Sequence, residues 1–157
     1  MPPSELPNVA ALLAPTLEAT APEARPLLIA LAERMAAGRY RTWAEASTEH
    51  AVVLRECAAR EEQIASIAEG LHADAAGIQA GLRTAHPELD TLNRTLFEGR
   101  PVHDQYTLQA QGERLGAATW RALADASEAD AREAYLACAE LEERSAEVLE
   151  AILGTAR

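Results

Sequence analysis

Four long stretches of the chain place apolar residues at the 3.6-residue period of an amphipathic helix, and this periodicity constrains the fold more than any other feature. Ala, Leu, Glu and Arg dominate these stretches, and all four residue types favour helices. β-branched and aromatic residues are sparse and nowhere alternate as they do in strands. We predict long helices at about 22–46, 48–71, 104–126 and 127–153. Four such helices with short first and last links form an all-α four-helix bundle.

Polar residues mark the expected helix starts. Thr48 and Asp104 each precede a periodic stretch, and Ser127 is followed three residues later by Asp130. Side-chain oxygens of such residues accept hydrogen bonds from the free N–H groups of a first helical turn. We therefore predict Thr48, Asp104 and Ser127 as N-caps.

The connection between the second and third long helices, residues 72–103, is interrupted by Gly and Pro and is long enough to cross the bundle from end to end. Residues 1–20 are predicted to form an N-terminal arm, and residues 21–157 the bundle domain. Short helices are expected at about 9–17, 74–84 and 87–97.

The chain also repeats itself. Residues 43–65 read WAEASTEHAVVLRECAAREEQIA, and residues 120–146 read WRALADASEADAREAYLACAELEERSA, with a link four residues longer. Cys57 matches Cys138, and the pair Glu61-Glu62 matches Glu142-Glu143. The repeat predicts two similar antiparallel helical hairpins that face each other.

Each long helix carries one glutamate on its apolar face instead of its polar face. These residues are Glu33, Glu61, Glu113 and Glu142. Glu61, for example, shares its face with Leu54, Cys57 and Ile64, which lie seven, four and three residues away. Within each hairpin the two glutamates stand at similar distances from the link, so at about 1.5 Å per residue all four can meet at one level.

Buried carboxylates cannot stay charged and unpaired, because desolvating a single ion costs several kcal/mol. The four could bind cations, hold protons at a raised pKa, or pair with Arg39, Arg60 or Arg144. Most arginines lie on the opposite helix faces, so arginine pairing is the least expected. For any single glutamate, a side chain that reaches solvent through a gap is a further alternative.

The spacings Glu33-Ala36-Tyr40 and Glu113-Gly116-Trp120 resemble the first and third helices of rubrerythrin-type ferritin-like domains. The runs EEQIA at 61–65 and EERSA at 142–146 are similar to the E-x-x-H-A motifs of that family's second and fourth helices, and the resemblance spans about 30–153. It implies a ferritin-like bundle that binds two iron or manganese ions, with an activity as peroxidase, oxidase or ferroxidase. Its metal ligands would be the four glutamates.

The chain departs from the family's motifs at three positions. Ile64 and Ser145 stand where both E-x-x-H histidines would be, and Gly116 stands where rubrerythrins often carry a further glutamate. The remaining donors are oxygens, with Ser145 as an extra candidate, and such a set suits Mn²⁺, Mg²⁺, Ca²⁺ or ferrous iron. A rubredoxin-like Cys₄ module is also missing from the sequence.

Two hypotheses therefore stay open. In the first, the chain is a carboxylate di-metal protein, with iron or manganese as cofactor, that reduces O₂ or peroxide or handles metal. In the second, it is a ferritin-like scaffold with a degenerate, metal-free site that serves as a binding or structural module. A homodimer is expected in either case, and the sequence identifies no protein partner or substrate.

The other polar and sulfur-bearing residues near the glutamates receive modest roles. Cys57 and Cys138 lie one turn before Glu61 and Glu142 and are expected to pack as small buried hydrophobes. Gln105 and Gln109 continue the inner face of the third long helix, so we expect them to make the mouth of the site polar.

Charge and cysteine content limit the partners and the compartment. The chain has 25 acidic residues against 14 arginines, a formal net charge of −11, whereas nucleic acids and anionic membranes attract clustered positive charge. We expect neither as a partner. No basic segment precedes an apolar run as in a secretory signal, and two separated cysteines make no disulfide framework. A reducing cytoplasm is the expected location.

Overall fold

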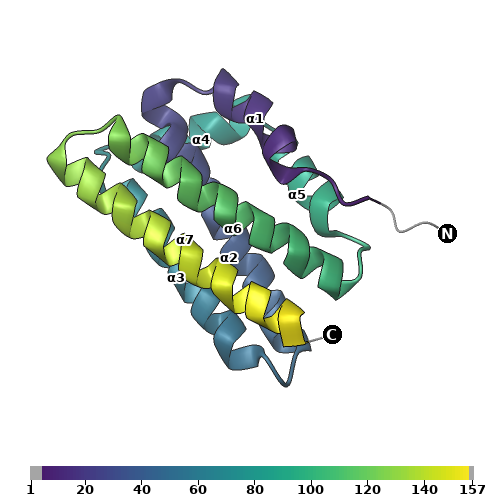
Figure 1. Cartoon of the computed structure of the whole chain (residues 1–157). Coiled ribbons are helices and arrows are strands. Elements are labelled where there is room, and N and C mark those ends of the chain that lie inside the picture. The colour runs from purple at the N-terminus through teal and green to yellow at the C-terminus, as the bar shows by residue number, and fades with distance from the viewer. Residues whose placement is uncertain (1–4, 156–157) are drawn as a thin grey trace.

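The computed structural model describes residues 5–155 and is all-helical over that range (Figure 1). In chain order the helices are α1 (Val9–Ala19), the 3₁₀ turn η1 (Pro22–Ala24), α2 (Arg25–Ala46), α3 (Ala51–Gly70), α4 (Ala75–Ala85), α5 (Glu88–Phe97), α6 (Val102–Asp125) and α7 (Ala129–Thr155). The predicted all-α class is thus confirmed, and every predicted helix is present. Residues 1–4 of the predicted arm and 156–157 of the predicted domain lie outside the described residues.

The predicted cap at the start of α3 is wrong. Helix α3 begins at Ala51, and His50 occupies the N-cap position without a side-chain capping bond. The backbone N–H of His50 instead donates to Oγ of Ser47 over 3.0 Å. The turn therefore uses the hydroxyl of Ser47, three residues before the cap, and Thr48 does not cap the helix.

The other two predicted caps are also wrong. Helix α6 begins at Val102, and Pro101 takes the cap position, so Asp104 lies inside the first turn. Its charge there still favours the helix, because the N-terminus carries the positive end of the dipole. The hydroxyl of Ser127 donates to the carbonyl oxygen of Leu123 over 2.6 Å, which ties Ser127 to the end of α6.

Two antiparallel hairpins, α2–α3 and α6–α7, make up the bundle, and they pack against each other mainly through α3 and α7 (Figure 1). Small residues on the buried faces of α3 and α7, among them Ala58, Ala65, Ala139 and Ala146, permit this close approach. Helices α2 and α6 do not approach each other as closely, and α1 and α5 lie over that side of the bundle, both of them in contact with α6.

The connection formed by α4 and α5 runs the length of the bundle, as predicted. Near the end of α2, the ring of Trp43 contacts the ring of Tyr106 from the start of α6 edge-on, at 5.1 Å between centroids. The chain must therefore travel from the end of α3 back to the level where α3 begins. No helix within residues 5–155 combines the length and the apolar character needed to cross a bilayer.

Candidate metal centre

The four predicted glutamates are all buried at the middle of the bundle, one from each long helix. The exposed fraction of each residue is small: 8% for Glu33, 0% for Glu61, and 1% for both Glu113 and Glu142. Carboxylate oxygens of Glu33, Glu61 and Glu142 lie within 4.8 Å of one another. Glu113 is not part of that closest group, but its charge acts on all three of the others.

The glutamates form a polar layer between two separate hydrophobic clusters. Along α3, Ala58 belongs to the first cluster and Ile64 to the second, with Glu61 between them. Along α7, Ala139 belongs to the second cluster and Leu149 to the first, with Glu142 between them. The carboxylates thus interrupt a core that apolar residues could have filled continuously.

Two of the four carboxylates receive hydrogen bonds from neighbouring side chains. The hydroxyl of Tyr40 donates to Oε1 of Glu113 over 2.5 Å, and Nε2 of Gln109 donates to the same oxygen over 2.8 Å. The indole N–H of Trp120 donates to Oε1 of Glu142 over 3.0 Å. These donors hold Glu113 and Glu142 in defined orientations.

Three other carboxylate oxygens of the described glutamates lack a hydrogen-bond donor. Within residues 5–155, both carboxylate oxygens of Glu61 and Oε2 of Glu113 are buried without a hydrogen-bond partner. Buried polar atoms of this kind are uncommon in native proteins, because each costs the free energy of its lost hydration. Protons on these groups or a cation among them would supply the missing interactions.

Arginines approach the layer but do not pair with it. Arg39 donates from Nε and Nη2 to Oε1 of Gln109, over 3.1 and 2.8 Å, and from Nη1 to Asn93. Arg60 donates to Oγ of Ser145 over 3.1 Å and to Sγ of Cys57 over 3.2 Å. Among the described residues no salt bridge reaches any of the four glutamates. Burial lowers the pKa of Arg39 to about 10.

Burial disfavours the charged form of the clustered acids. It raises the pKa of Glu33, and it raises the pKa values of Glu61 and Glu142 well above 4.5, where the charges of neighbouring glutamates add to the shift. Burial and the charge of Glu113 likewise raise the pKa of Tyr40 well above 10. The phenol therefore keeps its proton and remains a donor to Glu113.

The positions that depart from the rubrerythrin motifs have structural explanations. Ile64 is fully buried in the second hydrophobic cluster, and Ser145 is fully buried with its hydroxyl bonded to Arg60. A Cβ at Gly116 would lie 2.6 Å from Cδ of Glu142, so a side chain at this position would displace that carboxylate. The glycine therefore makes room for Glu142.

Two of the secondary predictions have clear outcomes. Cys57 and Cys138 are both free and fully buried, as predicted for packing residues. Gln109 lies beside the carboxylates, but Gln105 accepts a hydrogen bond of 2.8 Å from the indole of Trp43 at the end of the bundle. The prediction that Gln105 lines the mouth of the site is therefore wrong, because its partner holds it away from Glu113.

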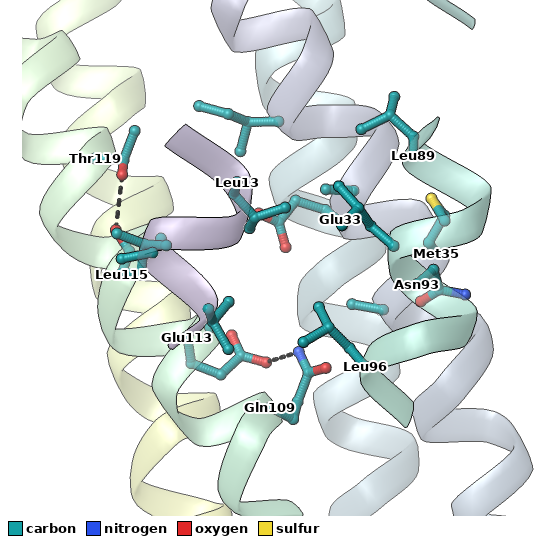
Figure 2. A pocket seen from close by; sticks show the side chains of 18 of the residues that line it. Leu13, Glu33, Met35, Leu89, Asn93, Leu96, Gln109, Glu113, Leu115 and Thr119 are labelled. Atoms are coloured by element: carbon teal, nitrogen blue, oxygen red, sulfur yellow. Dashed lines mark hydrogen bonds between the residues drawn. The ribbon is translucent and has the colours of Figure 1, made fainter. Parts of the chain in front are cut away.

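Sequence reasoning missed the cavity beside the site, which α1, α2, α5 and α6 enclose (Figure 2). Leucines repeated along 12–17 and 89–96 are the signal that could have indicated it, since these short helices needed an apolar surface to cover.

Comparison of the chain with family models, with curated proteins and with solved structures finds no match.

Proposed function

We propose that the chain is a ferritin-like protein whose core glutamates bind two divalent iron or manganese ions, and that it acts as an oxidoreductase or handles metal. The observation that carries this proposal is the set of buried carboxylate oxygens without hydrogen-bond partners, on Glu61 and Glu113. Glu61 also belongs to the group of three glutamates, with Glu33 and Glu142, whose carboxylate oxygens lie within 4.8 Å of one another. A cation among them would supply the missing interactions.

The donor set fits hard divalent ions. Carboxylates from four helices provide oxygen ligands, and four negative charges balance two divalent cations. Glu33, Glu61 and Glu142 would hold the metal directly, and Glu113 would complete the set. Paired inward glutamates on facing helices are how four-helix bundles hold two metal ions.

Iron or manganese held by these residues would supply redox chemistry toward O₂ or peroxide. The protein's own groups would orient the ligands: Tyr40 and Gln109 fix Glu113, and Trp120 fixes Glu142. The hydrophobic clusters on both sides of the layer would keep water out of the site. Electrostatic interactions are stronger where water is excluded, because the effective dielectric constant is lower.

The second candidate is a ferritin-like scaffold with a degenerate, metal-free site that serves as a binding or structural module. The observation in its favour is that neither nitrogen ligand of the rubrerythrin motifs is present, because Ile64 and Ser145 occupy those positions. In this case the clustered carboxyls hold protons, in line with the raised pKa values of Glu33, Glu61 and Glu142.

Elemental analysis of protein purified from metal-supplemented cells separates the two candidates. We expect iron or manganese at up to two ions per chain in the wild type, and a loss of this metal in Glu61→Gln. The matched control is Glu62→Gln, which alters the adjacent carboxylate on the outer face and should retain the metal. Metal-free wild-type protein whose melting temperature does not change on addition of Mn²⁺ or Fe²⁺ would overturn the metal proposal.

A further inference from the structure

A cavity of about 340 Å³ leads from the side of the bundle to the glutamate layer (Figure 2). Leucine is the most frequent residue in its walls, and the leucines come from α1 (Leu13, Leu17), α2 (Leu28), α5 (Leu89, Leu92, Leu96) and α6 (Leu108, Leu115). Glu33, Glu113 and Glu142 line the same cavity, so it ends at three of the four core carboxylates. Its volume is within the range of pockets that hold small molecules, about 300–1,000 Å³.

Small residues on the long helices create this space. Gly112 and Gly116 of α6, together with Ala32 and Ala36 of α2, line the cavity where larger side chains could have closed it. A Cβ at Gly112 would meet no atom of the described residues within 4 Å. The cavity therefore results from the residues chosen at these positions, on the side where α2 and α6 are separated.

The polar groups in the cavity restrict which molecule fits. Arg39 is committed to Gln109 and Asn93, and it stacks over the ring of Phe97 at 4.1 Å. No cation is thus free to receive an anionic head group, which would also meet the carboxylates of Glu33 and Glu113. The carboxylates of Glu33, Glu113 and Glu142, by contrast, place hydrogen-bond acceptors at the inner end of the cavity.

We propose that this cavity binds a slender apolar molecule that ends in a hydroxyl group, such as a medium-chain primary alcohol. The chain lies against the leucines of α1 and α5, and the hydroxyl donates a hydrogen bond to a carboxylate at the inner end of the cavity, where Glu33 is the most exposed of the four core glutamates. A neutral donor, unlike an anionic head group, adds no negative charge beside these carboxylates. The proposal deepens the proposed function by naming the class of molecule that reaches the site. Any reaction of that molecule rests on the metal centre, but its binding does not.

Displacement of the fluorescent probe 1-aminoanthracene by decan-1-ol tests this inference. We expect saturable displacement from the wild type, and at least tenfold weaker displacement by decanoate, whose length is the same but whose head group is anionic. Gly112→Leu fills the cavity and should weaken decan-1-ol at least tenfold. Gly38→Leu is the matched control, because Gly38 is exposed on α2 outside the cavity and a Cβ there also meets nothing within 4 Å of the described residues.

Three results would overturn the inference: no displacement from the wild type, equal affinity in Gly112→Leu and Gly38→Leu, or decanoate as strong as decan-1-ol. Should Gly112→Leu not fold, methyl NMR of the wild type gives the same decision. Decan-1-ol should then shift the methyl signals of Leu13, Leu92 and Leu96, and unchanged signals would contradict binding in the cavity.

The same titrations in metal-free and Mn²⁺-treated protein separate this inference from the proposed function. Decan-1-ol binding without any Mn²⁺ binding would remove the metal proposal and support the cavity proposal. Mn²⁺ binding with no displacement by decan-1-ol in either form would do the reverse.

Discussion

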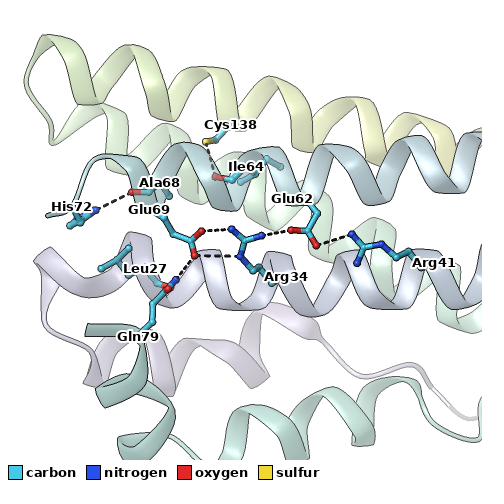
Figure 3. Close-up of polar contacts among 10 residues, drawn as sticks. All are labelled: Leu27, Arg34, Arg41, Glu62, Ile64, Ala68, Glu69, His72, Gln79 and Cys138. Carbon is cyan, nitrogen blue, oxygen red and sulfur yellow. Dashed lines mark hydrogen bonds and ion pairs between the residues drawn. The ribbon is translucent and has the colours of Figure 1, made fainter. Parts of the chain in front are cut away.

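Glu61 and Glu62 are neighbours in sequence but lie in opposite environments. Glu62 points to the outer face of α3, where Arg34 and Arg41 both donate to it, and Arg34 also bridges to Glu69 (Figure 3). Glu61 points into the core, where neither of its oxygens has a partner among the described residues. The second hairpin repeats this contrast, because Glu143 pairs with Arg121 over 2.7 Å while Glu142 is buried.

Arginines lie near the core carboxylates, but they do not pair with them. Arg39 and Arg60 both extend toward the layer, but their guanidinium groups end on Gln109 and on Ser145 with Cys57. The outer carboxylates of Glu62, Glu69 and Glu143 are thus paired with arginines, and the core carboxylates are not. Their charge must be met by protons or by an ion from outside.

The largest expected effect comes from making the core resemble an ordinary apolar one. Glu61→Leu combined with Glu142→Leu should raise the free energy of unfolding of metal-free protein by about 1–4 kcal/mol, because apolar residues of similar volume often replace buried charged groups with a gain. Urea unfolding followed by circular dichroism measures this change. The single variant Glu62→Leu is the control and should not stabilise. A marked loss of stability in the double variant would show that the carboxyls are already satisfied in the metal-free fold.

The second prediction concerns pH. In the window above about pH 5, the unfolded chain has released its carboxyl protons, whereas Glu33, Glu61 and Glu142 keep theirs to a higher pH in the fold because burial raises their pKa values. The folded state then binds more protons, so metal-free protein should lose stability as the pH rises through this window. The double leucine variant should lose less.

The stabilisation of the fold by Mn²⁺ should instead increase as the pH rises through the same window, since metal ligands must be deprotonated. Melting curves with and without Mn²⁺ at each pH test both halves of this prediction. The surface acids Glu69 and Glu150 do not interfere. Arginine partners lower their pKa values, and their contribution is lost only below about pH 4.5.

A smaller effect is expected at two glycines of α6. Gly116→Ala places a methyl group against the carboxylate of Glu142, whereas Gly112→Ala places one in open space. Alanine favours the helix by about 1 kcal/mol in both variants, so this gain cancels in the comparison. We expect Gly116→Ala to weaken Mn²⁺ binding about tenfold, which corresponds to about 1.4 kcal/mol, relative to Gly112→Ala. Equal affinities measured by calorimetry would show that Glu142 is free to move or is not a ligand.

The smallest effect should come from the outer face. Arg34→Ala removes the salt bridges from Arg34 to Glu62 and to Glu69. These side chains are partly exposed, and 37% of the Arg34 side chain is accessible to solvent. We predict a cost of at most about 1 kcal/mol that shrinks as salt is added. A larger, salt-insensitive loss would mean that the outer carboxylates resemble the core ones more than their geometry indicates.

Periodicity alone located the helices and the four inward glutamates, because the face that a residue occupies follows directly from the 3.6-residue repeat. The polar residues before each helix misplaced the caps at Thr48, Asp104 and Ser127, since several polar residues compete near each helix start and local hydrogen bonds decide among them. Periodicity missed the cavity. Periodicity shows which face is buried but not how far apart two helices lie, and the separation of α2 and α6 depends on α1 and α5.

The measurement that tests the metal proposal most directly is a titration of metal-free protein with Mn²⁺, in which electron paramagnetic resonance records the free ion. We predict that wild type and Glu62→Gln suppress the free-ion signal until up to two ions per chain are bound, the number held by carboxylate di-metal bundles. Glu61→Gln should leave the signal largely intact from the first addition. A full free-ion signal in the wild type, or equal binding by Glu61→Gln and Glu62→Gln, would contradict a metal centre at these glutamates.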